Sequence, residues 1–353
     1  MAKQILYITP NFSTFVKKDL KALKEHYHVT APSLAWNVKR KLPLNLLSQF
    51  IFLLFHIQRF DYVICMFAGY WSLLPTFFSK IYKVPNGVIL GGTECKSYPE
   101  INYGSLRKNT LKFFIKHTVK NADILLPVHH SLLYYEDQYF NNSKQGLLNF
   151  FPELKFNYKE IHNGFDSELW PFDQSQKKPS HFITVANIYN NTTFRLKGID
   201  LILSLAVEKP SLKFYIVGIT SEFSKSIEIP QNVVCLPKMP QNQFKDLLKE
   251  CGFYFQLSIA EGFPNALCEA MLCGCIPIGS SVNAIPDIIN NAGFILKNRS
   301  LKLLIKLVND TQGLSEKELS ERYRRSRERI KDQYSLHKRK AQLKTIIESK
   351  NRL

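Results

Sequence analysis

The sequence predicts an α/β protein of two domains, each built around a parallel β-sheet flanked by helices. The chain has 353 residues and is 45% hydrophobic, which is enough for two domains of ordinary size with a core each. Short β-rich runs alternate with helix-length segments in the first half of the chain, and the same alternation restarts in the second half. Alternation of this kind predicts βαβ units and therefore parallel sheets.

The expected strands are short runs rich in β-branched and aromatic residues. In the first half they cover residues 5–8, 61–67, 87–91 and 123–128, and in the second half 181–188, 213–218, 232–236, 252–257 and 275–279. Several of these runs are almost continuously apolar, as expected for strands that are covered on both faces.

The clearest domain boundary lies near residue 170. An Asn163-Gly164 turn, the prolines at 171 and 179, and the polar stretch 173–178 follow one another there. We therefore expect domains at 1–170 and 171–335. From residue 315 the chain is rich in Glu, Arg and Lys at helical spacing and contains no Gly or Pro, so it predicts surface helices. We expect the basic helix at 336–353 to pack back on the first domain.

Several classes of protein are disfavoured by simple patterns. No run reaches the ~20 apolar residues that span a bilayer, and the most apolar stretch, 42–57, contains polar residues and predicts an amphipathic or buried helix. The N-terminus shows no apolar signal region, so we expect a cytoplasmic protein. The seven cysteines form an odd count without metal-type spacing, which indicates reduced core thiols.

The net charge of +18 predicts a partner that is anionic: nucleic acid, a phosphorylated substrate or an acidic membrane surface. Lysines and arginines recur at helical spacing over 17–24 and over 107–120. Two solvated helix faces would explain these clusters equally well.

The segment 260–274 carries the strongest chemical signal. It follows an apolar run and has the pattern of a strand, a Gly/Pro loop and a helix, with Asn265 expected as the N-cap. Glu261 in the loop and Glu269 in the helix then lie near one helix N-terminus, where free amides and the helix dipole attract phosphate. Carboxylates accept hydrogen bonds from sugar and ribose hydroxyls, so this arrangement suits a nucleotide-sugar. Two glutamates eight positions apart also occur by chance, with the second as a solvated helix residue.

A second polar site lies upstream. Arg195 and Lys197 follow the expected strand 181–188 through a polar loop. Two cations at the mouth of a helix can balance the charge of a diphosphate leaving group, although a solvated helix start has the same composition.

Together these motifs resemble the retaining glycosyltransferases of group 1, family 4. The resemblance covers roughly residues 161–300 and rests on 197–200 (Lys-Gly-Ile-Asp), 216–218, the run 261–274, and the flanking matches 163–166, 275–280 and 285–289. It implies the GT-B fold, in which two Rossmann-like domains face each other across a cleft. The N-terminal domain would then bind the acceptor and the C-terminal domain the nucleotide-sugar.

The resemblance also implies roles for individual residues. Glu261 would contact the donor sugar, and Lys197 with Arg195 would hold the diphosphate, so these three are the expected catalytic residues. Glu269 would bind the ribose, and the amides of Asn265, Ala266 and Leu267 would complete the phosphate site. The remaining expected donor-site residues are Gly262, Phe263 and Asn187, the last of which stands where many members carry an arginine.

In such enzymes the departing phosphate helps to deprotonate the acceptor, so that no dedicated base is required. The chain has no Asp-x-Asp run, and we expect neither a metal nor a cofactor. On the acceptor side Gly91-Gly92-Thr93-Glu94 replaces the His-Gly-Thr-Asp of many members. Glu94, Asn11, Ser13 and Thr14 are the candidate acceptor residues, and turn structure explains them equally well. We interpret His129 and His130 as strand-end packing.

The expected function is transfer of a sugar from a nucleotide-sugar donor to a hydroxyl of a glycan or lipid-linked acceptor, in bacterial cell-surface polysaccharide or lipopolysaccharide assembly. Because the basic clusters and the apolar stretch 42–57 all lie in the N-terminal half, we expect peripheral contact with the anionic inner face of the cell membrane. The alternative is a catalytically inactive binding or regulatory subunit with the same fold.

Two other functions are disfavoured. The sequence has no zinc-finger spacing and no aromatic RNA-recognition signature, so we expect no nucleic-acid partner. A dinucleotide-dependent oxidoreductase would need Gly-x-Gly-x-x-Gly after the first strand, where Thr9-Pro10-Asn11-Phe12 stands instead.

Overall fold

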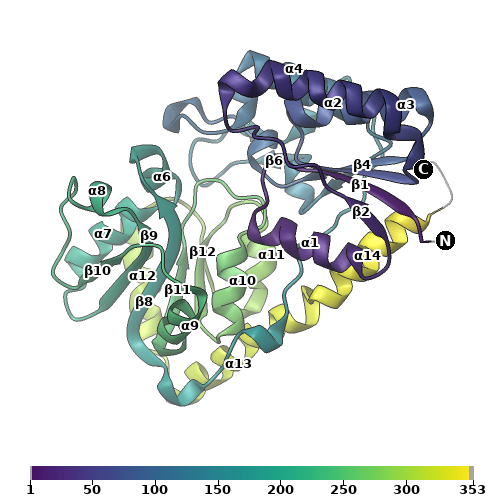
Figure 1. Ribbon diagram of the computed structural model, residues 1–353. Coiled ribbons are helices and arrows are strands. Elements are labelled where there is room, and N and C mark those ends of the chain that lie inside the picture. Colours follow the sequence, from purple (N-terminus) through teal and green to yellow (C-terminus); the bar gives the residue numbers. More distant parts are fainter. Residues whose placement is uncertain (1, 350–353) are drawn as a thin grey trace.

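The computed structural model describes residues 2–349, which form two α/β halves side by side (Figure 1). The first half contains a five-stranded sheet with strand order β2-β1-β3-β4-β5, and the second a six-stranded sheet with order β10-β9-β8-β11-β12-β13. Every strand pair within these two sheets is parallel. The predicted fold class is therefore confirmed.

Each predicted strand is present within a few residues of its expected limits. The strands are β1 Gln4–Ile8, β2 His28–Thr30, β3 Tyr62–Met66, β4 Asn86–Leu90, β5 Ile124–Pro127, β6 Tyr135–Glu136, β7 Lys144–Gln145, β8 Lys178–Ile188, β9 Lys213–Ile219, β10 Val233–Leu236, β11 Cys251–Gln256, β12 Ile276–Ser280 and β13 Phe294–Leu296. The edge strands β2 and β13 and the small antiparallel pair β6-β7 were not predicted, because runs of two or three residues are too short to show a period.

The helices connect successive strands, as βαβ units require. They are α1 Thr14–Lys24, α2 Leu42–His56, α3 Tyr70–Tyr82, α4 Asn109–Asn121, α5 Leu147–Phe150, α6 Asn191–Leu196, α7 Ile199–Glu208, α8 Ser221–Ser224, α9 Gln241–Glu250, α10 Asn265–Leu272, α11 Ile285–Ile289, α12 Leu301–Gln312, α13 Glu316–Gln333 and α14 Leu336–Glu348.

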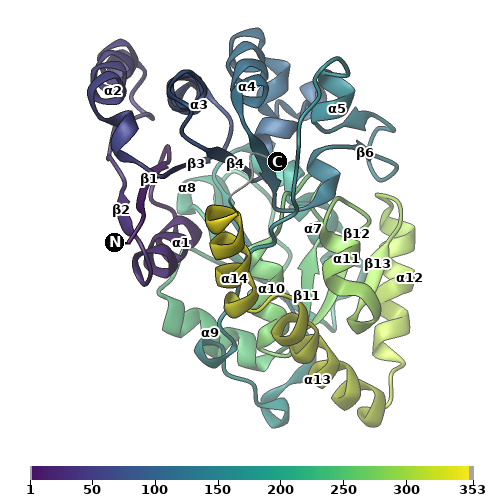
Figure 2. The same cartoon turned by 90° about the vertical axis from the view of Figure 1, so that its right-hand side faces the viewer.

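Helices cover both faces of the first sheet. Helices α2, α3 and α4 lie in a row on one face, and α1 with α14 lies on the other (Figures 1 and 2). The central strands β3 and β4 are buried along their whole length, because both of their faces are covered.

The chain passes between the halves through two segments that run beside each other. Phe165 N–H donates to Tyr334 O (2.9 Å), and Leu336 N–H donates to Phe165 O (2.8 Å). After this crossing, helix α14 of the C-terminal end lies along α1 of the first half (Figure 1). Our division of the chain at residues 170 and 335 stays a prediction, and residues 350–353 of the third predicted segment lie outside the described residues.

Buried charges hold α14 against α1. The guanidinium of Arg339 donates to both carboxylate oxygens of Asp19, at 2.6 Å and 2.5 Å, and also to the carbonyls of Ile161 and His162 in the crossing segment. Both side chains of the ion pair are almost fully buried. An ion pair of this kind persists because its remaining donors are also satisfied.

Among the described residues, no helix combines the length and the apolarity needed to cross a membrane. The apolar stretch predicted as an amphipathic or buried helix is α2. It is amphipathic, but it turns its polar side toward the protein and its apolar side outward. Its polar residues Asn45 and Gln49 are buried against the protein, whereas most of its leucines and phenylalanines are exposed.

Candidate active site

A cavity of about 500 Å³ lies between the two halves. Its walls come from α1 in the first half, and from the carboxyl ends of β8 and β9, the segment after β10, and α10 in the second half. The lining residues used below are Thr14, Lys18, Asn187, Gly218, Lys238, Met239, Asn265, Ala266 and Glu269. In open parallel sheets ligands bind beyond the carboxyl ends of the strands, and this cavity has that position.

Helix α10 presents its N-terminus to this cavity. It begins at Asn265, with Pro264 in the N-cap position, so the prediction of Asn265 as the N-cap is wrong by one residue. A proline there is extended and carries no N–H, which suits the residue before the first helical turn. The amides of Asn265, Ala266 and Leu267 lie in that first turn, where helical residues lack intrahelical acceptors, and the helix dipole makes this end attractive to phosphate.

Glu269 lies one turn further along α10 in the same cavity. The Nζ of Lys18, from α1 of the other half, lies 4.0 Å from its carboxylate. Burial raises the pKa of Glu269 to about 7, and the charges of Lys18 and Lys245 oppose this rise. Near neutral pH this carboxyl group is therefore close to its titration midpoint.

Glu261 lies in the loop before α10 and accepts three hydrogen bonds on one oxygen. Lys197 Nζ (2.5 Å), Ser258 Oγ (2.7 Å) and Gln256 Nε2 (3.0 Å) all donate to its Oε1. No described residue donates to Oε2, which leaves that oxygen available to a ligand hydroxyl. The structure thus brings together the predicted pair Glu261 and Lys197.

Backbone contact between the halves positions the Glu261 loop. A Cβ atom on Gly262 would lie 1.6 Å from Gly91 O, which belongs to the loop after β4. Only a glycine allows this approach, so Gly262 has a structural reason for its place beside Glu261.

Lys96 and Asn283 join the same region and were missed by the sequence analysis. Lys96 Nζ and the Glu261 N–H (3.3 Å) both donate to Asn283 Oδ1. Burial lowers the pKa of Lys96 to about 8, with nearby acidic groups opposing the shift. Lys96 follows the Gly-Gly-Thr-Glu loop by two residues, which is the one sequence signal that could have found it.

Lys197 reaches Glu261 because of the turn that follows it. Gly198 has φ +68°, and a Cβ there would lie 2.3 Å from Leu257 O, so the turn between α6 and α7 packs directly on the end of β11. Arg195 is exposed on α6, and within residues 2–349 no acidic group pairs with its guanidinium. The structure therefore does not bring Arg195 to either glutamate.

The predicted acceptor residues do not gather at one point. The buried carboxylate of Glu94 accepts hydrogen bonds from the amides of Gly91 (2.7 Å) and Gly92 (3.1 Å), closing its own loop. Ser13 N–H donates to Asn11 Oδ1 in a local turn. Thr14 lines the 500 Å³ cavity, whereas Asn11 lines a second cavity of about 620 Å³.

Two predicted donor-site side chains point elsewhere. The ring of Phe263 packs against Tyr334 (5.1 Å between centroids) and His162 (5.5 Å) in a cluster at the crossing between the halves. Leu267 is fully buried, so only its backbone remains a candidate for ligand contact. Asn187 is exposed and does line the cavity.

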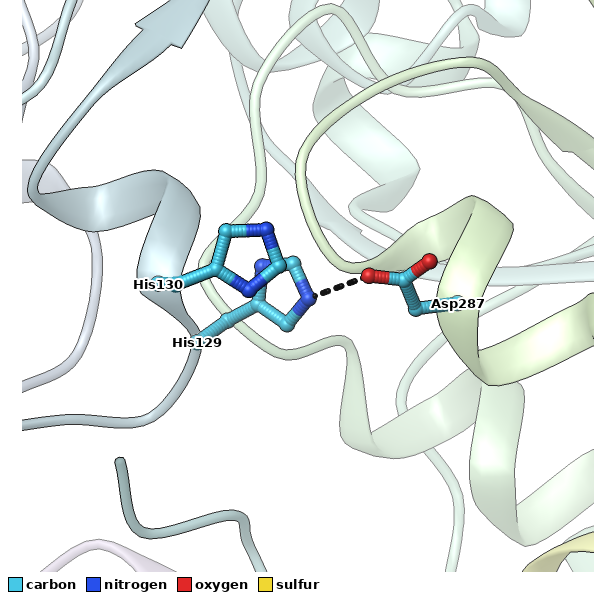
Figure 3. A group of neighbouring side chains, drawn as sticks. All are labelled: His129, His130 and Asp287. Carbon is cyan, nitrogen blue, oxygen red and sulfur yellow. Dashed lines mark hydrogen bonds and ion pairs between the residues drawn. The ribbon is translucent and has the colours of Figure 1, made fainter. Parts of the chain in front are cut away.

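His129, predicted as strand-end packing, has a carboxylate partner in the other half (Figure 3). Its Nε2 lies 2.9 Å from Asp287 Oδ2, and this contact lowers the pKa of Asp287. His130 lies close enough for the three side chains to resemble a metal-ligand group. His129 Nδ1 also lies within hydrogen-bond distance of Ser131 Oγ (2.9 Å), so both ring nitrogens have a protein partner. We interpret the contact as a hydrogen bond between the halves.

The sequence is similar to a known protein family and to a curated protein. Residues 172–329 match the family model of glycosyl transferases group 1. The N-acetyl-alpha-D-glucosaminyl L-malate synthase of Bacillus anthracis is 25% identical over 256 residues, covering 67% of this chain. The chain covers 62% of the length of that curated relative.

Solved structures share the whole fold. Sucrose-phosphate synthase from Thermosynechococcus elongatus has a TM-score of 0.74 at 11% identity, covering 98% of both chains. The Anabaena protein HepE in complex with UDP and glucose has a TM-score of 0.70 at 13% identity, covering 98% of this chain and all of HepE. Staphylococcus aureus TarM, in complex with fondaparinux, alpha-GlcNAc-glycerol and UDP, has a TM-score of 0.62 at 16% identity, covering 87% of this chain and 59% of TarM. The chain therefore has the GT-B fold and carries, at residues 172–329, a domain of the glycosyl transferases group 1 family.

Proposed function

We propose that this chain is an active glycosyltransferase that takes a sugar from a nucleotide-sugar and transfers it to a hydroxyl group with retention of anomeric configuration. One observation carries the proposal: Glu269 and the N-terminus of α10 share one cavity, and the loop that begins this helix holds the Glu261–Lys197 pair. In this proposal Glu269 accepts hydrogen bonds from the ribose, the first amides of α10 bind the phosphates, and Glu261 binds the sugar. All three belong to one loop and the helix that follows it.

In this proposal the donor spans the cavity. The base lies near Lys238 and Met239, the ribose hydroxyls donate to Glu269, and the diphosphate faces the first amides of α10. The sugar then reaches Glu261, whose Oε2 accepts from its hydroxyls. The relative HepE, which was solved with UDP and glucose, supports a nucleotide-sugar donor and makes UDP the first nucleotide to test.

The reaction follows from this placement. The bond between the anomeric carbon and the diphosphate oxygen breaks while the acceptor hydroxyl attacks the same face, and its proton passes to the departing phosphate. Lys197 leaves Glu261 to neutralise the diphosphate, and the α10 amides stabilise the developing charge. Because Lys197 and the α10 amides can supply the charge that a metal supplies elsewhere, we propose that the reaction requires no metal.

We propose that the acceptor is a glycan or a lipid-linked sugar bound in the 620 Å³ cavity. Trp36 and Tyr70 line this cavity together with Asn11, and aromatic rings offer apolar faces on which a sugar ring can pack. TarM, which binds glycan-like molecules, supports a glycan acceptor. In this proposal the protein acts on the cytoplasmic side of the cell membrane, in bacterial cell-surface polysaccharide or lipopolysaccharide assembly.

Calorimetric titration with UDP, GDP and ADP tests the donor site, with EDTA present to remove free metal. We expect one nucleotide to bind the wild type, and both Glu269→Ala and Lys197→Ala to weaken binding by about tenfold or more. The controls are Glu208→Ala and Lys306→Ala, which remove exposed charges from the same half. If a folded wild-type protein binds no nucleotide, the inactive GT-B subunit replaces this proposal.

A further inference from the structure

Helix α2 is attached to the protein by its polar side. Asn45 Nδ2 donates to Ala35 O (3.1 Å) and Gln49 Nε2 donates to Trp71 O (2.9 Å), and Leu53, one turn after Gln49, is fully buried. A helix on a protein in water normally buries its apolar side and exposes its polar side, so this orientation is reversed. Within residues 2–349, the reversal leaves most of the large apolar side chains on the outer side of α2 exposed.

The exposed apolar residues form one surface over three helices. Helices α2, α3 and α4 lie side by side on the outer face of the first sheet (Figure 2). We call this surface the apolar face, and its members are Leu44, Leu47, Phe50, Ile51, Leu54 and Phe55 of α2, Phe77 and Ile81 of α3, and Phe113 of α4. Each of these side chains is at least 41% exposed. A gathering of large exposed apolar side chains on neighbouring helices is typical of an interaction site.

The charge around the apolar face has one sign. The segments 39–60, 70–83 and 105–121 contain no Asp or Glu. The exposed cations of these same segments are Arg40, Lys41, Arg59, Lys80, Lys83, Lys108 and Lys120. Lys116 of α4 pairs with Glu153 (2.6 Å). The partner must therefore accept apolar side chains and supply negative charge at their border.

We infer that the apolar face docks on an anionic lipid bilayer. A bilayer offers an apolar interior below a layer of negative headgroups, which matches apolar side chains with a cationic border. A second copy of this chain fits less well, because a symmetric contact between two such faces would bring cations against cations.

The docking surface leads toward the proposed acceptor cavity. The inner side of α2 contributes Gln49 and Phe52 to a mainly apolar cavity of about 100 Å³. This cavity shares Leu34 and Trp36 with the 620 Å³ cavity of the acceptor. A lipid-linked acceptor could therefore keep its chain near the bilayer while its sugar reaches the cleft. This link rests on the proposed function, whereas the docking itself does not.

Co-sedimentation with vesicles tests the docking. We expect the wild type to bind phosphatidylglycerol vesicles at low salt, and to bind phosphatidylcholine vesicles more weakly. The triple variant Leu47→Gln, Ile51→Gln, Phe55→Gln should lower the partition coefficient by about tenfold or more, because three apolar side chains no longer enter the bilayer. The matched control is Val207→Gln with Leu303→Gln, which changes exposed apolar residues of the second half and should bind as the wild type does.

A second triple variant tests the charged border. Lys80→Gln, Lys108→Gln, Lys120→Gln should reduce binding to phosphatidylglycerol by about tenfold or more and weaken its salt dependence. The control is Lys302→Gln with Lys306→Gln on α12, which removes exposed lysines from the other half. None of the substituted residues lines a described cavity, so all variants should bind nucleotide as the wild type does.

Three results would overturn the inference. The wild type does not bind phosphatidylglycerol vesicles, or the apolar triple variant binds them equally well, or sedimentation equilibrium shows a vesicle-independent dimer that the apolar triple variant breaks. Nucleotide titration separates the two proposals, because loss of vesicle binding with intact nucleotide binding contradicts the docking alone. Vesicle binding by a protein that binds no nucleotide contradicts the proposed function alone.

Discussion

The carboxyl group of Glu269 lies in an environment that opposes its ionisation. Burial raises its pKa to about 7, and Lys18, the closest cation, is 4.0 Å away. A buried carboxyl with one distant partner costs stability when ionised, and such groups are concentrated at functional sites. In the proposed donor site, ribose hydroxyls would provide the hydrogen bonds that the free protein lacks.

This environment predicts that donor binding depends on pH. Ionised Glu269 accepts two hydrogen bonds from the ribose, whereas the protonated form loses acceptor capacity. Affinity for a nucleotide-sugar should therefore be highest above the pKa of about 7 and fall as the pH decreases through it. Calorimetry at several pH values measures this affinity. The ligand should be an intact nucleotide-sugar, because the terminal phosphate of a free nucleoside diphosphate would itself titrate near neutral pH.

Two variants provide the controls for this pH dependence. Glu269→Gln should bind weakly at every pH, with no midpoint near neutrality. Lys18→Ala should move the midpoint to higher pH, because the charge of Lys18 lowers the pKa of Glu269. An unchanged midpoint in Glu269→Gln would assign the pH dependence to another group.

The same carboxyl group predicts a cost in stability. Its pKa is raised from 4.5 when unfolded to about 7 when folded, so the folded state binds the proton more tightly. The cost is absent below pH 4.5, grows as the pH rises toward 7 and is complete above it. Glu269→Gln should therefore increase the free energy of unfolding above neutral pH by up to about 3 kcal/mol. Urea unfolding at acidic and alkaline pH measures this, and equal stability at high pH would contradict the assigned burial.

Gly262 predicts an effect of a single methyl group on turnover. In Gly262→Ala the new Cβ would clash with Gly91 O, and the two loops must separate. Because a displacement of about 1 Å can cost 100-fold in rate, we expect loss of at least about tenfold in sugar release from the donor. Gly313→Ala is the control, since its nearest new contact is 3.7 Å away. Wild-type turnover in Gly262→Ala would mean that the closed contact is not used in the reaction.

At this scale the sequence indicated only the residues that lie close together along one motif. Glu261 and Glu269 belong to one loop and helix, and Lys197 belongs to a recognisable turn. Lys18, Lys96 and Asn283 reach the same region from elements that only the tertiary fold brings together, so no local pattern assigns them to this site.

Among the elements, α1 and α14 offer an internal comparison of two ion pairs. Asp19–Arg339 is almost fully buried, whereas the pair between Glu25, which caps the C-terminus of α1, and Lys340 of α14 is partly exposed. Breaking a buried pair leaves an uncompensated charge, so Asp19→Ala should lower the free energy of unfolding by about 3–5 kcal/mol. Lys340→Ala should cost less than about 1 kcal/mol, because water screens the exposed pair.

Urea unfolding of both variants under the same conditions measures this difference. Equal effects of the two substitutions would contradict the role of Asp19 and Arg339 in holding α14 to the first half.

Helix α2 shows where prediction from sequence stops at the scale of elements. Its composition predicts a helix, and the structure has one at Leu42–His56. The side that faces inward depends on Ala35 and Trp71, whose carbonyls accept from Asn45 and Gln49. Hydrophobic periodicity alone assigns the apolar side of a helix to the core. It therefore cannot predict a helix whose side-chain amides, those of Asn45 and Gln49, face the protein.

For the whole molecule, the alternation of strands and helices was sufficient to predict two parallel sheets. It could not predict how the halves meet, because contacts such as His129–Asp287 and Phe165–Tyr334 join residues more than 150 positions apart. The cavity depends on that arrangement, since Thr14 and Lys18 face Asn265 and Glu269 across it.

The cavity between the halves should hold the nucleotide of the donor. A crystal structure with the nucleoside diphosphate selected by calorimetry tests it directly. We predict a ribose within hydrogen-bond distance of Glu269, the diphosphate at the first amides of α10 with Lys197 turned toward it, and the base near Lys238 and Met239. A nucleotide bound outside this cavity, or one inside it with its phosphates directed away from α10, would contradict the account.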